Sequence, residues 1–277
     1  MIIRIAQQNL QRAKTETVEV RNTIAERKID IYLTQEPYTL KGKILGIGQQ
    51  FAIFINKNMQ ILYRDNLSTD QITVIMIQKP KPIYFISASF ASSLDIHTDI
   101  IKLQYTLDKL KGKNIMLGID TNAKSKLWYS TTEDKRVEHM ETFIGRNYFY
   151  ILNEQTYLKT YDSIHGKSNI DLTLVTNGII NNCQNWEIKE STSDHNLITL
   201  EIQDKQNKIN RTKIIVYKHF KKVKREREKE NFRNKFTQVT DEIVNMHIED
   251  KIRIVLETIR EFFKEVKLIT NEYHQPK

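Results

Sequence analysis

Apolar residues in this chain recur at two spacings, one typical of strands and one typical of helices. Short apolar runs, several joined by hairpin-like turns, predict strands. The strand-like runs are residues 2–6, 29–33, 51–55, 61–63, 72–78, 83–89, 115–119, 170–175 and 197–202. Longer stretches with helical spacing lie at residues 15–28, 96–110 and 140–148, and the second is followed by Gly112 as a stop signal. The order is neither strict strand–helix alternation nor all strand.

Hairpins mixed with crossover helices favour a layered α/β fold. We expect a four-layered α/β-sandwich, in which two packed mixed β-sheets are flanked by helices. The chain has only four prolines and eight glycines, so no flexible linker is evident. A shift in charge near Asp204 instead predicts a boundary between a domain at residues 1–203 and a C-terminal helical extension at 204–277. In that extension one apolar helical stripe needs cover; it consists of Ile248, Ile252, Val255, Ile259, Phe262 and Val266.

The positive charge is concentrated in one segment. The chain carries a net charge of +9, and residues 205–235 alone hold thirteen Lys or Arg residues against three Glu. Such a segment favours a polyanionic partner, most simply nucleic acid, either DNA or RNA. The alternating run Arg225–Glu230 also fits a solvated charged helix. Both interpretations stay open at this point.

Composition narrows the class of protein. Hydrophobic residues make up 39% of the chain, enough for a core, yet no apolar run approaches the roughly 20 residues that span a bilayer. Residues 1–6 are too short and alternating for a signal peptide. The single cysteine, Cys183, cannot form an internal disulfide and is expected near the core. We therefore expect a nuclear or cytoplasmic protein, not a secreted one, without a membrane partner.

Polar residues that could bind a metal or take part in a reaction lie where predicted strands end. They are Asn9, Glu36, Asp120, Asn122, Asp171, Asp194 and His195. Residues at strand ends can converge on one rim of a sheet, and several carboxylates there need a hard cation or protons. Oxygen donors suit Mg²⁺, and with a histidine they could hydrolyse a phosphodiester. Taken singly, most of these residues could simply cap turns, although an acid inside an apolar run, such as Asp171, usually has a dedicated partner.

Five segments in order resemble the endonuclease–exonuclease–phosphatase superfamily, and more narrowly the apurinic-type endonuclease domain of non-LTR retrotransposons of the R1 or jockey kind. The resemblance covers about residues 1–203. The segments are Arg4-Ile-Ala-Gln-Gln-Asn-Leu10, Asp30-Ile-Tyr-Leu-Thr-Gln-Glu-Pro-Tyr38, Gly118-Ile-Asp-Thr-Asn-Ala-Lys-Ser-Lys-Leu-Trp128, Ser168-Asn-Ile-Asp-Leu-Thr-Leu174 and Ser193-Asp-His195. Five motifs in the right order and spacing are far more specific than any one of them.

The resemblance implies a metal site. Glu36 would ligate Mg²⁺, with Mn²⁺ as an alternative ion. Asn9 and Asp194 would lie nearby as further ligands, and Gln7 would contribute more weakly.

The resemblance also implies roles in catalysis. Asp120 would orient or deprotonate the attacking water, and Asn122 would bind the scissile phosphate. His195 would stabilise the pentacovalent phosphate as a donor, oriented by Asp171 through its other ring nitrogen. The expected activity is a metal-assisted nick in double-stranded DNA that leaves a 3′-hydroxyl, the primer for reverse transcription in such elements.

Two departures from the family pattern open alternatives. Ser89 stands where the family has a tyrosine that reaches the phosphate, so activity could be reduced about 10²-fold. No aspartate-pair polymerase motif occurs, so the chain could be a truncated element, a fragment or a domesticated nuclease. Besides the DNA endonuclease, two functions stay open: a catalytically weakened DNA-binding remnant, and a small-molecule phosphoesterase. The context of Pro37-Tyr38 and Leu127-Trp128 argues against the last.

Overall fold

The computed structural model of the chain describes residues 2–40, 43–44, 53–55, 59–79, 81–164 and 166–203. The predicted extension at residues 204–277 and its apolar stripe lie outside the described residues, as do residues 51–52 of one predicted strand. Within the described part of the chain, no helix is both long and apolar enough to cross a membrane.

A five-stranded mixed sheet forms one half of the fold. Its strand order is β14-β15-β1-β2-β5. The bounds are Cys183–Lys189 for β14, Leu197–Gln203 for β15, Ile2–Asn9 for β1, Ile31–Gln35 for β2 and Ile53–Ile55 for β5. Strands β1 and β2 are parallel, whereas every other neighbouring pair is antiparallel.

A six-stranded mixed sheet forms the other half, in the order β10-β13-β9-β8-β7-β6. The bounds are Tyr150–Ile151 for β10, Asp171–Val175 for β13, Asn114–Asp120 for β9, Ile83–Ser89 for β8, Ile72–Ile77 for β7 and Ile61–Tyr63 for β6. Here β8 and β9 are the parallel pair. Two small hairpins complete the described strands: β3 (Thr39–Leu40) with β4 (Lys43–Ile44), and β11 (Tyr161–Ser163) with β12 (Gly166–Ser168).

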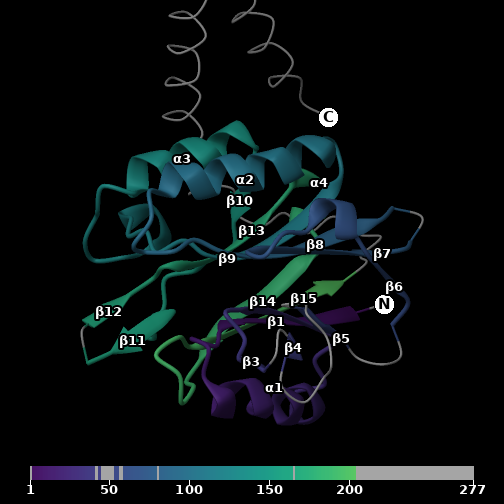
Figure 1. Ribbon diagram of the computed structural model, residues 1–277, viewed down its shortest axis with the longest axis horizontal. Helices are drawn as coiled ribbons and strands as arrows, with labels where there is room; N and C mark the ends of the chain where they lie inside the picture. The colour runs from purple at the N-terminus through teal and green to yellow at the C-terminus, as the bar shows by residue number, and fades with distance from the viewer. Residues whose placement is uncertain are drawn as a thin grey trace, which may run out of the picture. The chain divides into compact units, whose positions relative to one another are not determined.

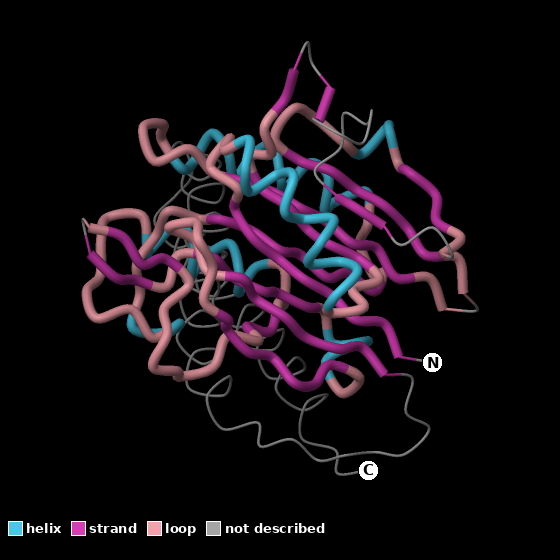
Figure 2. The backbone as a smooth tube through the Cα atoms, turned by 90° about the horizontal axis from the view of Figure 1, so that it is seen from below, coloured by secondary structure: helices cyan, strands magenta, loops and turns pink. Residues whose placement is uncertain are grey.

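Helices cover the outer faces of both sheets, as Figure 1 shows. Helix α1 (Lys14–Glu26) lies against the five-stranded sheet, and α2 (Ile96–Lys109) and α3 (Val137–Arg146) lie against the six-stranded sheet. The short helix α4 (Asn177–Ile180) and the 3₁₀ turns η1 (Asp65–Leu67) and η2 (Lys126–Trp128) lie in connections. Seen from below, the strands of the two sheets run roughly along one another (Figure 2).

Three apolar layers separate these elements. Leu103, Leu107 and Phe143 pack from α2 and α3 against one face of the six-stranded sheet. A second cluster, which includes Ile5 and Phe85, fills the space between the sheets. A third packs α1 against the far face of the five-stranded sheet. Because strands in both sheets are buried on both faces, their runs are continuously apolar. The predicted four-layered sandwich is confirmed.

The strand register brings the predicted site residues to one edge. Asn9 pairs with Gln35 at the carboxyl ends of parallel β1 and β2. Ser89 pairs with Asp120 at the carboxyl ends of parallel β8 and β9. Strand β13 is antiparallel to β9, so Asp171 at its start also pairs with Asp120. The site therefore lies across the ends of both sheets.

Strand β14 and the hairpin β11–β12 are absent from the sequence-based prediction. The alternation of β14 is interrupted by an irregular register between Gln184 and Glu187, with Asn185 at φ 57°. That bulge hides the strand from a period-two pattern. The strands of the hairpin are short and mostly polar, so they give no apolar signal.

Candidate active site

The five-stranded sheet contributes Asn9 and Glu36. Asn9 is the last residue of β1, and its amide Nδ2 donates to Asp120 Oδ2 at 2.7 Å. Glu36 directly follows β2 in a left-handed conformation, φ 45°. Its carboxylate contacts Arg12 Nε at 3.5 Å and accepts from Ser89 Oγ at 3.3 Å. The Glu36 side chain is 30% exposed, so it can reach a ligand from solvent.

The six-stranded sheet contributes Asp120 and Asn122. Asp120 ends β9 and is buried. Its Oδ1 accepts from the backbone N–H of Asn122 at 3.0 Å, which forms an Asx turn around Thr121. Asn122 has φ 47°, and its amide Nδ2 donates to the Phe90 carbonyl at 2.9 Å. The carboxylate of Asp120 is thus held in place from both sheets.

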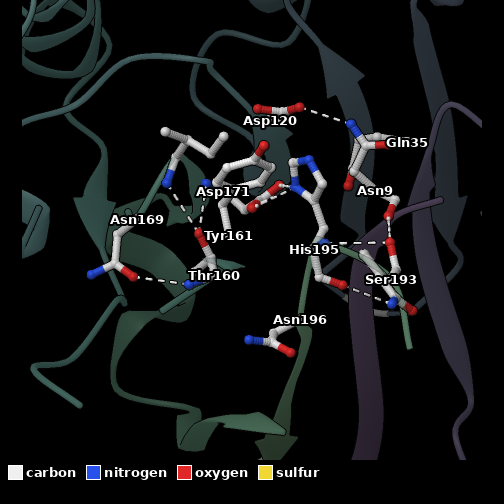
Figure 3. A network of polar contacts seen from close by, with 12 residues as sticks. Asn9, Gln35, Asp120, Thr160, Tyr161, Asn169, Asp171, Ser193, His195 and Asn196 are labelled. Carbon is white, nitrogen blue, oxygen red and sulfur yellow. Dashed lines mark hydrogen bonds and ion pairs between the residues drawn. The ribbon is translucent and has the colours of Figure 1, made fainter. Parts of the chain in front are cut away.

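His195 and Asp171 form a buried pair beside Asp120 (Figure 3). His195 Nδ1 lies 2.9 Å from Asp171 Oδ2 and 3.1 Å from Oδ1. The ring of Tyr161 meets the imidazole edge to face, with 5.1 Å between ring centroids. A ring held at Nδ1 leaves Nε2 as its second polar atom. The predicted contact between Asp171 and His195 is present.

Side chains around this pair fix its backbone. Gln8 Nε2 donates to the His195 carbonyl at 2.9 Å, and Gln8 Oε1 accepts from the Tyr32 hydroxyl at 2.6 Å. Thr160 Oγ1 accepts from the N–H groups of Ile170 and Asp171 at 3.0 and 3.1 Å. Buried hydrogen bonds of this kind limit how far the pair can move.

The environment raises the pKa values of two groups, which favours the neutral form of Asp120 and the charged form of His195. Burial and the nearby Asp171 carboxylate raise the pKa of Asp120 to about 7. Burial lowers the pKa of His195, but the charge and hydrogen bond of Asp171, together with the charges of Asp120 and Glu36, outweigh burial and raise the pKa to about 9. At neutral pH the imidazole is therefore charged, while Asp120 is close to its titration midpoint. Such paired shifts are typical of acid–base sites.

Two positions offer oxygen ligands for a cation. Among the described residues, Asp120, Asp171 and His195 bring potential ligand atoms within 4.8 Å of one another. A protonated imidazole cannot bind a metal, and the raised pKa keeps His195 protonated at neutral pH. The carboxylate of Glu36 and the amide of Asn9 offer oxygen atoms without that obstacle. The donor chemistry therefore fits Mg²⁺ or Mn²⁺ better on the side of Glu36.

Two predicted contributors to the metal site have other contacts in the structure. The Asp194 side chain is exposed and, like those of Glu36 and Asn9, lies outside the three-residue group. Its carbonyl accepts from the Asp162 N–H at 2.7 Å. The expectation that Gln7 contributes to the metal site is wrong. Gln7 is fully buried between the sheets, where its Nε2 donates to the Leu172 carbonyl and its Oε1 accepts from Thr173 Oγ1.

Ser89 borders a cavity of about 670 Å³ next to Glu36. Arg12, Tyr38 and Tyr63 are among the other residues that line it. The Ser89 hydroxyl donates to the Glu36 carboxylate at 3.3 Å. The short side chain at the position of the family's tyrosine thus leaves open space beside a predicted metal ligand.

The sequence-based prediction missed Thr160, Tyr161 and Arg12. Thr160 and Tyr161 lie at the start of the polar hairpin β11–β12, which has no apolar pattern. They reach the site through the hydrogen bond from the Asp171 N–H to Thr160 Oγ1 and the bridge between Tyr161 and His195. Arg12 follows Asn9 of the first motif by three residues, and this proximity was the one available signal.

Comparison with known proteins identifies the family. A family described as endonuclease-reverse transcriptase matches residues 83–199. The endonuclease domain of TRAS1, a telomere-specific non-LTR retrotransposon, is 30% identical, with a TM-score of 0.65 over 74% of this chain and 100% of that chain. The AP endonuclease LMAP from Leishmania major shares the fold at 9% identity, with a TM-score of 0.58 over 74% of this chain and 88% of that one. No curated protein sequence matches.

The identity to the TRAS1 domain, over its full length, confirms the resemblance found in the motifs. The chain belongs to the endonuclease–exonuclease–phosphatase superfamily of phosphoester hydrolases, in its branch of non-LTR retrotransposon endonucleases.

Proposed function

We propose that the protein is a Mg²⁺-dependent DNA endonuclease that nicks one strand of double-stranded DNA. One observation carries the proposal: the His195–Asp171 pair lies next to a buried Asp120 whose pKa is raised to about 7. This arrangement places a cationic hydrogen-bond donor and a weak base within one site, as hydrolysis of an anionic diester requires. The TRAS1 domain, itself an endonuclease, supports the choice of reaction.

In the proposed reaction each group has one role. Asp120 orients the attacking water and accepts its proton, a role that suits a carboxyl group with a pKa near neutrality. Asn122 binds a non-bridging oxygen of the scissile phosphate. His195, charged and held by Asp171, donates from Nε2 to the phosphate as negative charge accumulates. The P–O3′ bond breaks, and the oxygen leaves as a 3′-hydroxyl after taking a proton from solvent.

The cation belongs on the side of Glu36. Glu36 and Asn9, with Asp194 as the third predicted ligand, would hold Mg²⁺, and the ion would supply positive charge that stabilises the anionic phosphate. Mn²⁺ is expected to substitute, because it accepts the same oxygen ligands.

A plasmid assay tests the proposal. Incubation of the protein with supercoiled plasmid and Mg²⁺ is expected to produce relaxed circles, and EDTA is expected to stop it. The variants Asp120→Ala and His195→Ala should each lose about 10²-fold or more. Lys135→Ala, on the exposed loop before α3, is the control that should keep full activity. Relaxation no faster than that of the two inactive variants would refute an endonuclease.

A second function has one observation in its favour. Ser89 replaces the family's tyrosine, and its hydroxyl donates a hydrogen bond to Glu36. A DNA-binding remnant with weak catalysis would bind DNA in a salt-sensitive way without nicking it. Robust nicking by the unaltered chain excludes this alternative.

A further inference from the structure

Arg12 stands beside a predicted metal ligand. Its Nε lies 3.5 Å from Glu36 Oε2. The Arg12 side chain is 78% exposed, and an ion pair so exposed contributes little to stability. A gain in folding free energy therefore does not explain why Arg12 lies next to Glu36.

The backbone holds Arg12 in this place independently of its side chain. Gln11 and Arg12 are consecutive non-glycine residues in the left-handed region, with φ 48° and 56°. The N–H of Gln11 donates to Asn9 Oδ1 at 2.8 Å, and that of Arg12 donates to the Glu36 carbonyl at 2.7 Å. Left-handed conformations are disfavoured for such residues and persist where the surroundings impose them, often at functional sites. The turn therefore ties Arg12 to two predicted metal ligands.

The guanidinium also borders open space. Arg12, Glu36 and Ser89 line the same cavity of about 670 Å³. A planar guanidinium can bind a carboxylate or a phosphate through two parallel hydrogen bonds. A ligand phosphate in this cavity and the Glu36 carboxylate would thus compete for one group.

We propose that Arg12 is the counter-ion that Glu36 exchanges for its divalent cation, and that the released guanidinium then binds a backbone phosphate of the substrate strand. The proposal rests on the proposed function for its cation and its substrate. It assigns Arg12 a positioning role, because Arg12 prepares the ligand and then helps to place the strand.

The first test measures the affinity of the protein for a divalent cation in the absence of DNA. Electron paramagnetic resonance titration with Mn²⁺ compares the unaltered chain with Arg12→Gln, Arg12→Lys and Arg146→Gln. Removing a competing charge should tighten Mn²⁺ binding by about two- to five-fold in Arg12→Gln. Arg12→Lys keeps the charge, and Arg146→Gln removes an exposed one from α3. Both should stay near the unaltered value. Unchanged or weaker binding in Arg12→Gln, or no Mn²⁺ binding by the unaltered chain, overturns the proposal.

The second test asks when Arg12 contacts DNA. The dissociation constant of a short duplex is measured against salt, once with Ca²⁺ in place of Mg²⁺ and once with EDTA. With Ca²⁺, Arg12→Gln should lower the slope of log Kd against log salt by about one, the loss of a single phosphate contact. With EDTA, Glu36 retains the guanidinium, and the two slopes should agree. An equal loss under both conditions means a fixed phosphate contact and overturns the exchange.

These outcomes are separable from those of the nicking assay. Unchanged Mn²⁺ affinity in Arg12→Gln, with normal plasmid nicking, removes only the role of Arg12. Tighter Mn²⁺ binding by Arg12→Gln, without nicking by any variant, supports the exchange and refutes the endonuclease. Circular dichroism of each variant checks that the fold is intact.

Discussion

Asp120 and His195 are needed in opposite protonation states, and their surroundings supply both. Asp120 must be ionised to accept a proton, whereas His195 must be charged to donate a hydrogen bond to a phosphate. The raised pKa values, about 7 for Asp120 and about 9 for His195, leave a pH range between them in which both conditions hold.

The nicking rate is therefore expected to have a bell-shaped pH dependence. Below about pH 7 Asp120 is protonated and cannot accept a proton, so the rate rises with pH through this value. Above about pH 9 His195 loses its charge, so the rate falls again. Initial rates of plasmid nicking at saturating Mg²⁺, measured from about pH 5.5 to about pH 10, give the profile. A rate that does not change across this range would contradict these assignments.

The variant Asp171→Asn should separate the effect of the Asp171 charge on His195 from the effect of the size of the side chain. Asparagine keeps the size of the side chain but removes the charge that raises the pKa of His195. Without it, burial lowers that pKa, so the alkaline limb of the profile should move to lower pH. The nicking rate at neutral pH should fall by about 10²- to 10³-fold. Asp162→Asn, which removes a carboxylate from the ion pair with Lys167, is the matched control. An unshifted alkaline limb in Asp171→Asn would remove the assigned role.

Ser89→Tyr is expected to raise activity. The cavity of about 670 Å³ beside Ser89 offers room for the ring, and the longer side chain carries a hydroxyl toward the substrate. One added donor to the transition state is worth up to about 10²-fold in nicking rate. Ser92→Tyr, in the exposed turn that follows β8, should not change the nicking rate. If Ser89→Tyr nicks no faster than the unaltered chain, the serine does not limit activity.

Individual residues differ in how far the sequence could predict them. Asp120 and Asp171 end or begin apolar runs, so their convergence follows from strand polarity. The sequence could not place Arg12 beside Glu36, because its position depends on two residues in the left-handed conformation that no sequence pattern predicts. The burial that raises the pKa of Asp120 likewise arises only when both sheets pack.

At the scale of elements, Gly118 controls how closely β9 approaches the opposite sheet. A Cβ at this position would lie 2.9 Å from Gln7 Cδ and 2.9 Å from Leu33 Cδ1. Both neighbours belong to the five-stranded sheet, and Gln7 is fixed by hydrogen bonds to β13.

Gly118→Ala should therefore destabilise the fold. Overpacking at such a contact costs about 1–3 kcal/mol in the free energy of unfolding. Urea denaturation followed by circular dichroism measures this loss. Lys111→Ala, at an exposed position before β9, should stay within about 0.5 kcal/mol of the unaltered chain. Equal stability of the two variants would show that the sheets can separate freely at Gly118.

Elements were predictable where their apolar pattern is regular. Strands β7, β8 and β9 are apolar along nearly their whole length, and their predicted ranges agree with the structure to within one residue. Helix α3 begins at Val137, three residues before the predicted start, because only Val137 is apolar before Met140 and a single residue gives no helical spacing. Strand β14 escaped because its bulge breaks the alternation.

At the scale of the whole chain, the basic segment at residues 205–235 is predicted to add affinity for DNA, not catalysis. It holds thirteen Lys or Arg residues against three Glu, and salt-dependent binding grows with the number of phosphates neutralised. A chain shortened to residues 1–203 should nick plasmid at a similar maximal rate but bind duplex DNA more weakly, with a shallower salt slope. Filter binding at several salt concentrations measures both. An unchanged slope would mean that the segment neutralises no DNA phosphates.

The site is divided between two sheets, with Glu36 on one and Asp120 on the other, joined by the hydrogen bond from Asn9 to Asp120. The nicking rate therefore depends on how the two sheets of the sandwich are aligned. A slip of one sheet over the other would separate the cation from the water-activating base, while each sheet could keep its own hydrogen bonds. On heating, nicking activity should therefore be lost at a lower temperature than the circular dichroism signal of the strands. Loss of activity would then mark the temperature at which the two sheets lose their alignment.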